Sequence, residues 1–332
     1  MGYRLSLLDQ SPAEAGQTAE AALRATLNFA READRLGYHR LWVSEHHDSD
    51  RLAGSSPEVL VAWLLAQTSR LRIGSGGVML QHYSPYKVAE NFHLLAALAP
   101  DRVDIGIGKA PGGLPLSTRA LQGAMAGHND DFPARLKQLT HYLNSATQPA
   151  DGISARALPA PAVAPQRLLL GASPDSARLA ASLGWDFVFA GFINTREQAI
   201  QEAVLTYHEY AGGKGKAAIS LAAVAAETQQ QAALLVAQQH NYRVTVGDKH
   251  VTVGTQEQAE AFVRQSGARE HRIEKQPLNV LHGTADHIHQ QLRALSQRLS
   301  VGEFILHTPL TDAGQRLRSI TLLADQQIKE IG

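Results

Sequence analysis

Short apolar segments of strand length alternate with helical patterns along almost the whole chain. The strand candidates are rich in Val, Leu, Ile or Phe, and they cover residues 3–8, 40–44, 71–79, 102–108, 167–171, 186–190, 218–225 and 303–307. Strands with this composition are typical of parallel sheets that helices cover on the outside. The alternation therefore predicts an α/β protein with a parallel sheet built from βα units. Eight such units are the number in a TIM barrel.

The ends of two helices can be recognised from the residues that cap them. A helical pattern over 18–36 stops at Gly37, and a second one begins at Ser56 with Pro57 in its first turn. This second helix, 56–68, and much of a third, 86–98, are apolar almost all round, which is typical of helices buried on both sides. Outer helices of a barrel have one side free, so we expect these two to form a homodimer interface in preference to extra packing within the chain.

Two stretches interrupt the alternation. Residues 110–165 contain a Pro/Gly-rich start, a helical pattern around 132–144 and an Ala/Pro-rich connection over 155–165. Residues 227–277 are polar and rich in Gln, and we expect one helix after another there. Because the βα alternation resumes in register after each stretch, we interpret both as insertions in a single domain spanning 1–332.

Composition narrows the possible partners and chemistry. The 332 residues carry 31 basic and 31 acidic side chains, so no long-range field favours a nucleic acid or an acidic membrane surface. The absence of cysteine excludes disulfides, thiolate metal sites and cysteine nucleophiles. The chain starts without the layout of a secretion signal and has no apolar run near the roughly 18 residues of a membrane span. We therefore expect a cytoplasmic protein.

A histidine pair follows the second strand candidate. Side chains alternate along a strand, so Glu45 and His47 share one face and His46 takes the other. In a barrel this cluster would lie at the carboxyl end, where active sites are built. An unperturbed imidazole titrates near neutral pH and can give or take a proton, although a purely structural role is the alternative. We expect no metal, because adjacent strand residues diverge and no spaced third ligand follows.

The third strand candidate, 71–79, is interrupted by Gly74, Gly76 and Gly77. Glycine within a strand usually marks either a bulge or a place where a ligand plane lies against the backbone, and the sequence leaves both readings open. It is not a dinucleotide-binding fingerprint, because Met79 stands where glycine is required and no helix opens there.

The fourth strand candidate, 102–108, is followed directly by Lys109 among flexible residues. A cation at this end of a strand is suited to a phosphate or another anion, and a solvated surface lysine is the alternative. The phosphate-loop motif does not match, because Val103 occupies its first Gly position and Ala110 its Ser/Thr position.

A helix start follows the fifth strand candidate. Ser173 has the place of an N-cap, Pro174 that of the first helical residue, and Ser176 follows three residues after the cap. The free amides of a helix N-terminus together with two hydroxyls would hold a phosphate. An ordinary cap explains the same residues, and Asp175 would repel an anion if it pointed inward.

In series, these motifs resemble the bacterial luciferase-like flavin monooxygenases, particularly their single-chain branch without known light emission. The likeness covers nearly the whole chain and rests on Glu45-His46-His47, the Gly-rich segment 73–79 followed by Ser84-Pro85, residues 105–112, residues 171–176, Asp131-Phe132-Pro133, and the closing segments 302–306 and 313–323. Each motif alone is weak, whereas their order and spacing are specific.

The resemblance implies a (β/α)8 TIM barrel with insertions that binds reduced FMN at its carboxyl face. The activity it implies is that of a monooxygenase acting on paired donors, in which reduced flavin and O2 oxygenate a small organic substrate and a separate NAD(P)H-dependent flavin reductase supplies the FMN. By the same resemblance His46 is the catalytic residue. Gly76 and Gly77 would lie beside the flavin ring, often joined by a cis peptide.

Further cofactor-binding positions implied by the resemblance are Ala172, Ser173, Ser176 and Lys109. Relatives usually carry Arg in place of Lys109, and a point charge in place of a two-pronged donor would hold FMN less tightly. Gln81 stands where relatives commonly have Pro, so the substrate side of the pocket differs.

On the substrate side we expect His82 and Phe192. The loop from Gly112 onward and the 227–277 insertion are candidates for a lid. Two rival functions remain open: an F420-dependent oxidoreductase of the same fold, and a flavin-binding protein without turnover.

Overall fold

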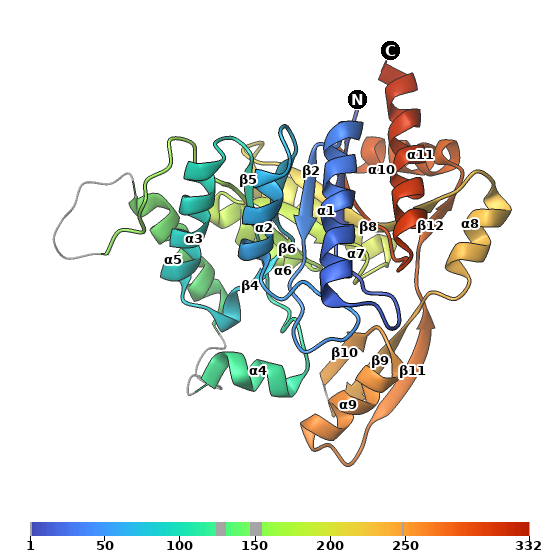
Figure 1. The fold of residues 1–332 in the computed structure, drawn as a ribbon. Coiled ribbons are helices and arrows are strands. Elements are labelled where there is room, and N and C mark those ends of the chain that lie inside the picture. The colour runs from blue at the N-terminus through green and yellow to red at the C-terminus, as the bar shows by residue number, and fades with distance from the viewer. Residues whose placement is uncertain (1, 124–130, 147–154, 248, 332) are drawn as a thin grey trace.

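Parallel strands form a closed barrel with helices around it (Figure 1), which confirms the predicted TIM barrel. The computed structural model describes residues 2–123, 131–146, 155–247 and 249–331. The barrel strands are β1 (Arg4–Asp9), β2 (Arg40–Val43), β3 (Arg72–Ser75) with its continuation β4 (Val78–Met79), β5 (Val103–Gly108), β6 (Gln166–Gly171), β7 (Asp186–Ala190), β8 (Ala217–Ala225) and β13 (Glu303–His307). They pair in the order β8-β13-β1-β2-β3-β5-β6-β7, and β7 pairs with β8 to close the ring.

The helices of the βα units begin and end where the capping residues predict. The first helix, α1 (Ala19–Leu36), has Thr18 as its N-cap and ends at Gly37, whose φ of 79° is left-handed. Pro57 stands in the first turn of the second helix. The remaining helices outside the insertions are α2 (Pro57–Ala66), α3 (Pro85–Leu98), α6 (Pro174–Leu183), α7 (Glu197–Ala211), α10 (Ala285–Leu299) and α11 (Ala313–Ile331).

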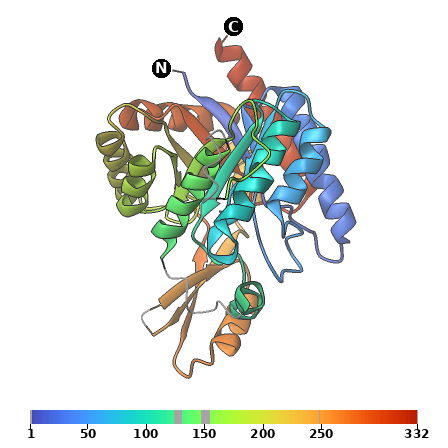
Figure 2. The same cartoon turned by 90° about the vertical axis from the view of Figure 1, so that its left-hand side faces the viewer.

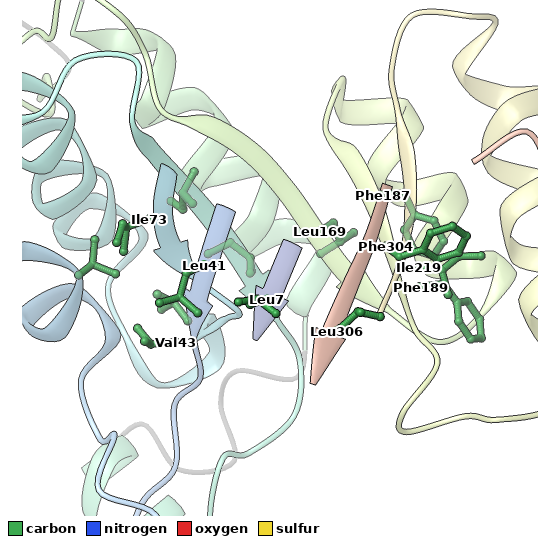
Figure 3. Close-up of a cluster of buried hydrophobic side chains, with 14 of the residues drawn as sticks. Leu7, Leu41, Val43, Ile73, Leu169, Phe187, Phe189, Ile219, Phe304 and Leu306 are labelled. Atoms are coloured by element: carbon green, nitrogen blue, oxygen red, sulfur yellow. The ribbon is translucent and has the colours of Figure 1, made fainter. Parts of the chain in front are cut away.

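The main core lies between the outer face of the barrel and the surrounding helices. Alternate strand residues point outward and pack there, and ten of them are labelled in Figure 3: Leu7, Leu41, Val43, Ile73, Leu169, Phe187, Phe189, Ile219, Phe304 and Leu306. Burial of this continuous apolar layer holds the helices against the barrel.

The inner face of the barrel carries apolar side chains in its middle and charged side chains at its amino end. Its middle holds a smaller apolar cluster of Leu8, Trp42, Leu168, Val188, Ala218 and Ile305. At the amino end Arg40, whose side chain is 2% exposed, pairs with Asp104 at 2.8 Å and with Glu303 at 2.7 Å. These side chains close the amino end of the interior, so the carboxyl end is the open mouth.

The third strand is not continuous, contrary to the segment predicted over 71–79. It breaks into β3 and β4 at Gly76 and Gly77, and both strands continue to pair with β5. A Cβ on Gly77 would lie 2.8 Å from the carbonyl oxygen of Gly106, so the break depends on backbone packed closely against backbone.

The second insertion was predicted wrongly as helix after helix. It contains α8 (Gln229–Val236) and α9 (Gln256–Ser266), but also an antiparallel sheet of β9 (His240–Val246), β10 (Lys249–Val253) and β11 (Arg272–Pro277). Gly247, with a φ of 56°, lies between the first two strands. Alternating Val and Thr residues on either side favour strands and outweigh the helical preference of the Gln-rich flanks. A short strand, β12 (Leu281–Gly283), which the sequence pattern had not indicated, extends the barrel sheet beside β8.

The first insertion follows its prediction more closely. It contains α5 (Phe132–Ser145), close to the predicted 132–144, and residues 155–165 form the predicted connection without helix or strand. An additional helix, α4 (Pro115–Gln122), precedes them. Residues 124–130 and 147–154 of this insertion lie outside the described part of the chain.

Strands from both ends of the chain share one sheet, which is consistent with a single domain. Within the described residues, no helix combines the length and the apolar character that crossing a membrane requires.

Candidate functional site at the barrel mouth

His46 lies immediately beyond β2, on the side of the mouth shared with Ser44. The Ser44 hydroxyl is 3.0 Å from His46 Nδ1, and the backbone of His46 donates to the Gly54 carbonyl at 2.8 Å. Burial lowers the pKa of His46 to about 4, against which Glu45 acts in the opposite direction. The ring is therefore neutral at pH 7 and, unlike an unperturbed imidazole, does not titrate near neutral pH.

Glu45 and His47 form a separate network on the opposite face, as strand alternation predicts. Glu45 is buried, and its Oε1 accepts from the Tyr83 hydroxyl at 2.8 Å and lies 2.7 Å from His47 Nε2. Its Oε2 accepts from the backbone of Met79 at 3.0 Å, and the His47 backbone donates to the Gly112 carbonyl at 2.8 Å. The Glu45 carboxylate thus ties the end of β2 to β4, and the His47 backbone ties it to the loop after β5.

Gly76 and Gly77 are joined by a cis peptide and are both buried. A Cβ on Gly76 would lie 2.9 Å from side-chain atoms of Leu8 and Trp42, in the interior cluster. Close packing inside the barrel, at the carboxyl end of β3, therefore leaves no room for a side chain at either position. A bulge-like break explains these glycines, and their contact with a flavin ring stays a prediction.

The predicted anion-binding residues directly follow two neighbouring strands. Lys109 follows β5 and is exposed, and no ion pair to it is found among the described residues. After β6, Ser173 caps α6: its Oγ accepts from the Ser176 amide at 3.3 Å and lies 3.2 Å from the Ser176 Oγ. Since β5 pairs with β6, the cation and the helix N-terminus lie at adjacent strand ends.

The local packing brings this helix start close to its strand. A Cβ on Gly171 would lie 2.3 Å from the Ser176 Cβ, so only glycine permits the approach. The Ala172 carbonyl accepts from Asn194 at 3.3 Å. Asp175 points away, because its side chain is 87% exposed and pairs with Arg178. The repulsion that Asp175 would exert on a bound anion is therefore largely removed.

The two residues predicted on the substrate side differ in what they offer. His82 is buried, and its nitrogens are engaged by the Pro111 carbonyl at 2.8 Å and the Gln122 amide at 3.4 Å. Its polar atoms thus support the loop after β5. Phe192 is partly buried, packs against the interior cluster, and has its ring centroid 6.0 Å from that of His307.

Sequence reasoning overlooked His307 and the partners of Glu45. His307 ends β13, so the rule that singled out His46, a histidine at the carboxyl end of a barrel strand, would also have found it. The Tyr83 contact to Glu45 spans 38 residues and left no sequence signal.

The two insertions meet below the barrel, at the end where the strands finish (Figure 2). The Leu116 amide of α4 donates to the Gln265 side chain of α9 at 3.0 Å. A cleft of about 850 Å3 opens between α9 and the loops that follow β1 and β2. None of the predicted cofactor-binding residues lines it, so it lies at the edge of the mouth and not at its centre.

The arrangement fits a flavin mononucleotide. An exposed cation, two hydroxyls and a helix N-terminus suit its phosphate, while the apolar inner face and a neutral histidine lie toward the barrel axis. Among the described residues, no group of His, Asp and Glu is arranged to hold a metal ion.

Comparisons with known proteins agree with the barrel fold. The family model described as luciferase-like monooxygenase matches residues 3–301. N-acetyl-S-alkylcysteine monooxygenase of Bacillus subtilis (strain 168) is 42% identical over 327 residues, 97% of each chain. The crystal structure of apo-MsnO8 superposes with a TM-score of 0.79 at 32% identity, covering 98% of each chain. The oxygenating constituent of 3,6-diketocamphane monooxygenase of Pseudomonas putida, in complex with FMN, has a TM-score of 0.71 and covers 99% of each chain, but its 17% identity shows the fold alone.

Proposed function

The chain belongs to the luciferase-like monooxygenases, and from this premise we propose that it is an FMN-dependent monooxygenase that oxygenates a small organic substrate. The observation that carries the proposal is the placement of His46, the anion-binding residues and an apolar interior at the same mouth of the barrel. When bound, reduced FMN would supply two electrons to O2, so that one oxygen atom enters the substrate and the other leaves as water.

The residues that would hold the cofactor are Lys109, Ala172, Ser173 and Ser176 on the phosphate side, and Gly76 with Gly77 on the ring side. Lys109 provides charge, and the N-terminus of α6 provides amides and the two serine hydroxyls.

His46 is the residue we propose as catalytic. If the Ser44 hydroxyl donates to Nδ1, the neutral ring carries its proton on Nε2. That Nε2–H can donate toward the mouth without a change in the charge of the ring. The role we propose is orientation of a reacting oxygen by this hydrogen bond, because giving the proton away would leave the neutral ring as an imidazolate anion.

The insertions would exclude water from the mouth. Because α4 and α9 are in contact, closure over a bound ligand would involve both. Exclusion of water limits the side reaction in which reduced flavin and O2 release hydrogen peroxide.

For the substrate we propose an N-acylated S-alkylcysteine or a similar thioether. The support is the 42% identity to a relative with this named activity, which extends over 97% of both chains. We further propose that a separate NAD(P)H-dependent flavin reductase delivers the reduced FMN.

A homodimer is the proposed assembly, through α2 and α3. These helices contact each other and expose large apolar side chains: Val59 (68%), Trp63 (37%), Leu94 (51%) and Leu98 (71%). Adjacent exposed apolar side chains of this size are typical of an interface.

A reductase-coupled assay tests the function. The protein, a flavin reductase, NADH, FMN, N-acetyl-S-methylcysteine and ¹⁸O2 are combined, and the product is examined by mass spectrometry. We expect one ¹⁸O atom per oxygenated product. Oxygen use equal to that of free reduced FMN, with no product, would favour a flavin-binding protein without turnover.

The same fold also serves F420-dependent dehydrogenases, so cofactor choice needs its own test. Fluorescence titration with FMN and with F420 compares the two directly. We expect tighter binding of FMN. A clear preference for F420 would instead favour an F420-dependent oxidoreductase, which transfers hydride and does not activate oxygen.

A further inference from the structure

His307 lies on the inner face of the barrel at its mouth. It ends β13, two residues after Ile305, which belongs to the interior cluster. Side chains two apart on a strand share a face, so the imidazole points toward the barrel axis, one level closer to the mouth. β1 separates β13 from β2, so His307 and His46 flank the end of β1.

The Nδ1 atom of His307 is buried and has no hydrogen-bond partner among the described residues. Buried polar side-chain atoms are bonded in the large majority of cases, and an exception indicates a missing ligand, water or ion. By contrast, Nδ1 of His46 faces Ser44, and both nitrogens of His82 are engaged. Among these three histidines, His307 is therefore the one whose Nδ1 has no partner.

The surroundings of His307 are apolar on one side. The Phe192 ring lies 6.0 Å from it between centroids, tilted by 54°. Phe192 also packs against a second cluster, which consists of Ala222, Val224, Val280 and Leu310. A polar atom beside such a wall would orient a ligand whose remaining contacts are hydrophobic.

The charge and tautomer of the ring follow from its neighbours. Burial lowers the pKa of His307 to about 4, Arg316 and His46 act in the same direction, and Asp9 and a backbone hydrogen bond with Leu8 oppose them. A hydrogen bond that raises the pKa is one that the ring donates. Because Nδ1 has no partner, the donor is Nε2, and Nδ1 is left as an acceptor.

We propose that His307 is a substrate-binding residue, whose Nδ1 accepts a hydrogen bond from the amide N–H of an N-acylated thioether while the alkyl group packs against Phe192. The inference rests on the proposed function and names the contact that selects its substrate. It assigns to β13 a specificity role separate from that of His46.

Equilibrium binding tests this contact without turnover. N-acetyl-S-methylcysteine is titrated calorimetrically into the FMN-loaded protein, its His307→Leu and His307→Asn variants, and the control His208→Gln on α7. We expect about three- to tenfold weaker binding to His307→Leu, since one neutral hydrogen bond is lost. His307→Asn keeps an acceptor near the position of Nδ1 and should recover most of the affinity, and the control should match wild type.

A second ligand isolates the amide proton. The analogue methylated on the amide nitrogen should bind wild type about three- to tenfold more weakly than the parent, and His307→Leu should bind both ligands alike. Thermal unfolding without substrate separates binding from structure. His307→Leu loses the unpartnered Nδ1 and one hydrogen bond to the Leu8 backbone, so its midpoint should fall by only a few degrees, whereas a histidine held by several contacts would lower it further.

Equal affinity of wild type and His307→Leu for the parent ligand, or no binding of this ligand to wild type, would overturn the proposal. The FMN affinity measured in the same samples keeps the two hypotheses apart. If wild type does not bind FMN, the proposed function is refuted. If wild type binds FMN and His307→Leu binds the substrate as tightly as wild type does, only the role of His307 is refuted.

Discussion

Ser44 and His46 are linked at the end of β2, with the serine Oγ 3.0 Å from the histidine Nδ1. Side chains two residues apart lie on the same side of an extended chain, so the serine is placed to fix the orientation and tautomer of the ring. The Glu45 carboxylate, one residue along, is bonded to Tyr83, His47 and Met79 instead. The end of the strand thus provides one oriented hydrogen-bond donor, His46, and one structural anchor, Glu45.

His46→Ala should reduce coupled product formation about 100-fold or more, because a preorganised hydrogen-bond donor to a reacting oxygen contributes about that much. FMN affinity should change by no more than a few fold, since the phosphate contacts remain. Ser44→Ala should reduce turnover by about three- to tenfold only. Product quantified in the reductase-coupled assay checks both, and equal turnover of His46→Ala and wild type would remove His46 from the mechanism.

Lys109→Ala should weaken FMN binding about tenfold and leave riboflavin binding unchanged, because only FMN carries the phosphate. Lys109 is exposed, so the effect should also shrink as salt is added. Fluorescence titrations of both flavins give the comparison. Identical losses for the two ligands would mean that Lys109 does not contact the phosphate.

Leu98→Asp combined with Val59→Asp should convert the proposed dimer to a monomer, because each places a charge in the apolar surface of α2 and α3. Leu234→Asp on α8 is the matched control, since Leu234 is 69% exposed on a helix outside that surface. Light scattering after size exclusion measures the mass. A wild type that elutes as a monomer at micromolar concentration would argue against the dimer.

Folding stability should fall as the pH drops from about 6.5 to about 4. His46 and His307 each have a pKa of about 4 in the folded chain against 6.5 as the ordinary value. In that interval the unfolded chain binds protons that the folded chain does not, so the loss grows toward pH 4 and vanishes above pH 6.5. We expect on the order of 3 kcal/mol for each histidine by pH 4, since one pKa unit is worth about 1.4 kcal/mol.

Urea unfolding at pH 7.5 and pH 4.5 measures this effect. Carboxylates also titrate near the lower pH, so the informative quantity is the difference between wild type and His307→Leu. The variant should lose less stability than wild type on acidification. The same loss in both proteins would mean that His307 is not held neutral by the fold.

Local signals predicted much of the barrel. Pro57 and Gly37 stand where the helix ends require them, and Ser173 caps α6 as its sequence indicates. These features depend on the conformations of neighbouring residues and can be read from a short segment. The placement of the catalytic candidates at one mouth then follows from the rule for parallel strands.

Other features depend on contacts between distant segments. The break after β3 needs the backbone of Gly106 close to Gly77, which no local pattern shows. The missing partner of His307 Nδ1 is visible only once all its neighbours are placed. The strands β9 to β11 were overlooked for a different reason. The Gln-rich flanks favour helices, whereas the alternation of side chains in 242–246 favours a strand.

A crystal structure of the protein with FMN tests the central claim most directly. We expect density for the phosphate between Lys109 and the N-terminus of α6, with the ring at the mouth that carries His46 and the Gly76–Gly77 peptide. Density for FMN at the amino end of the barrel, or on its outer surface away from these residues, would contradict it.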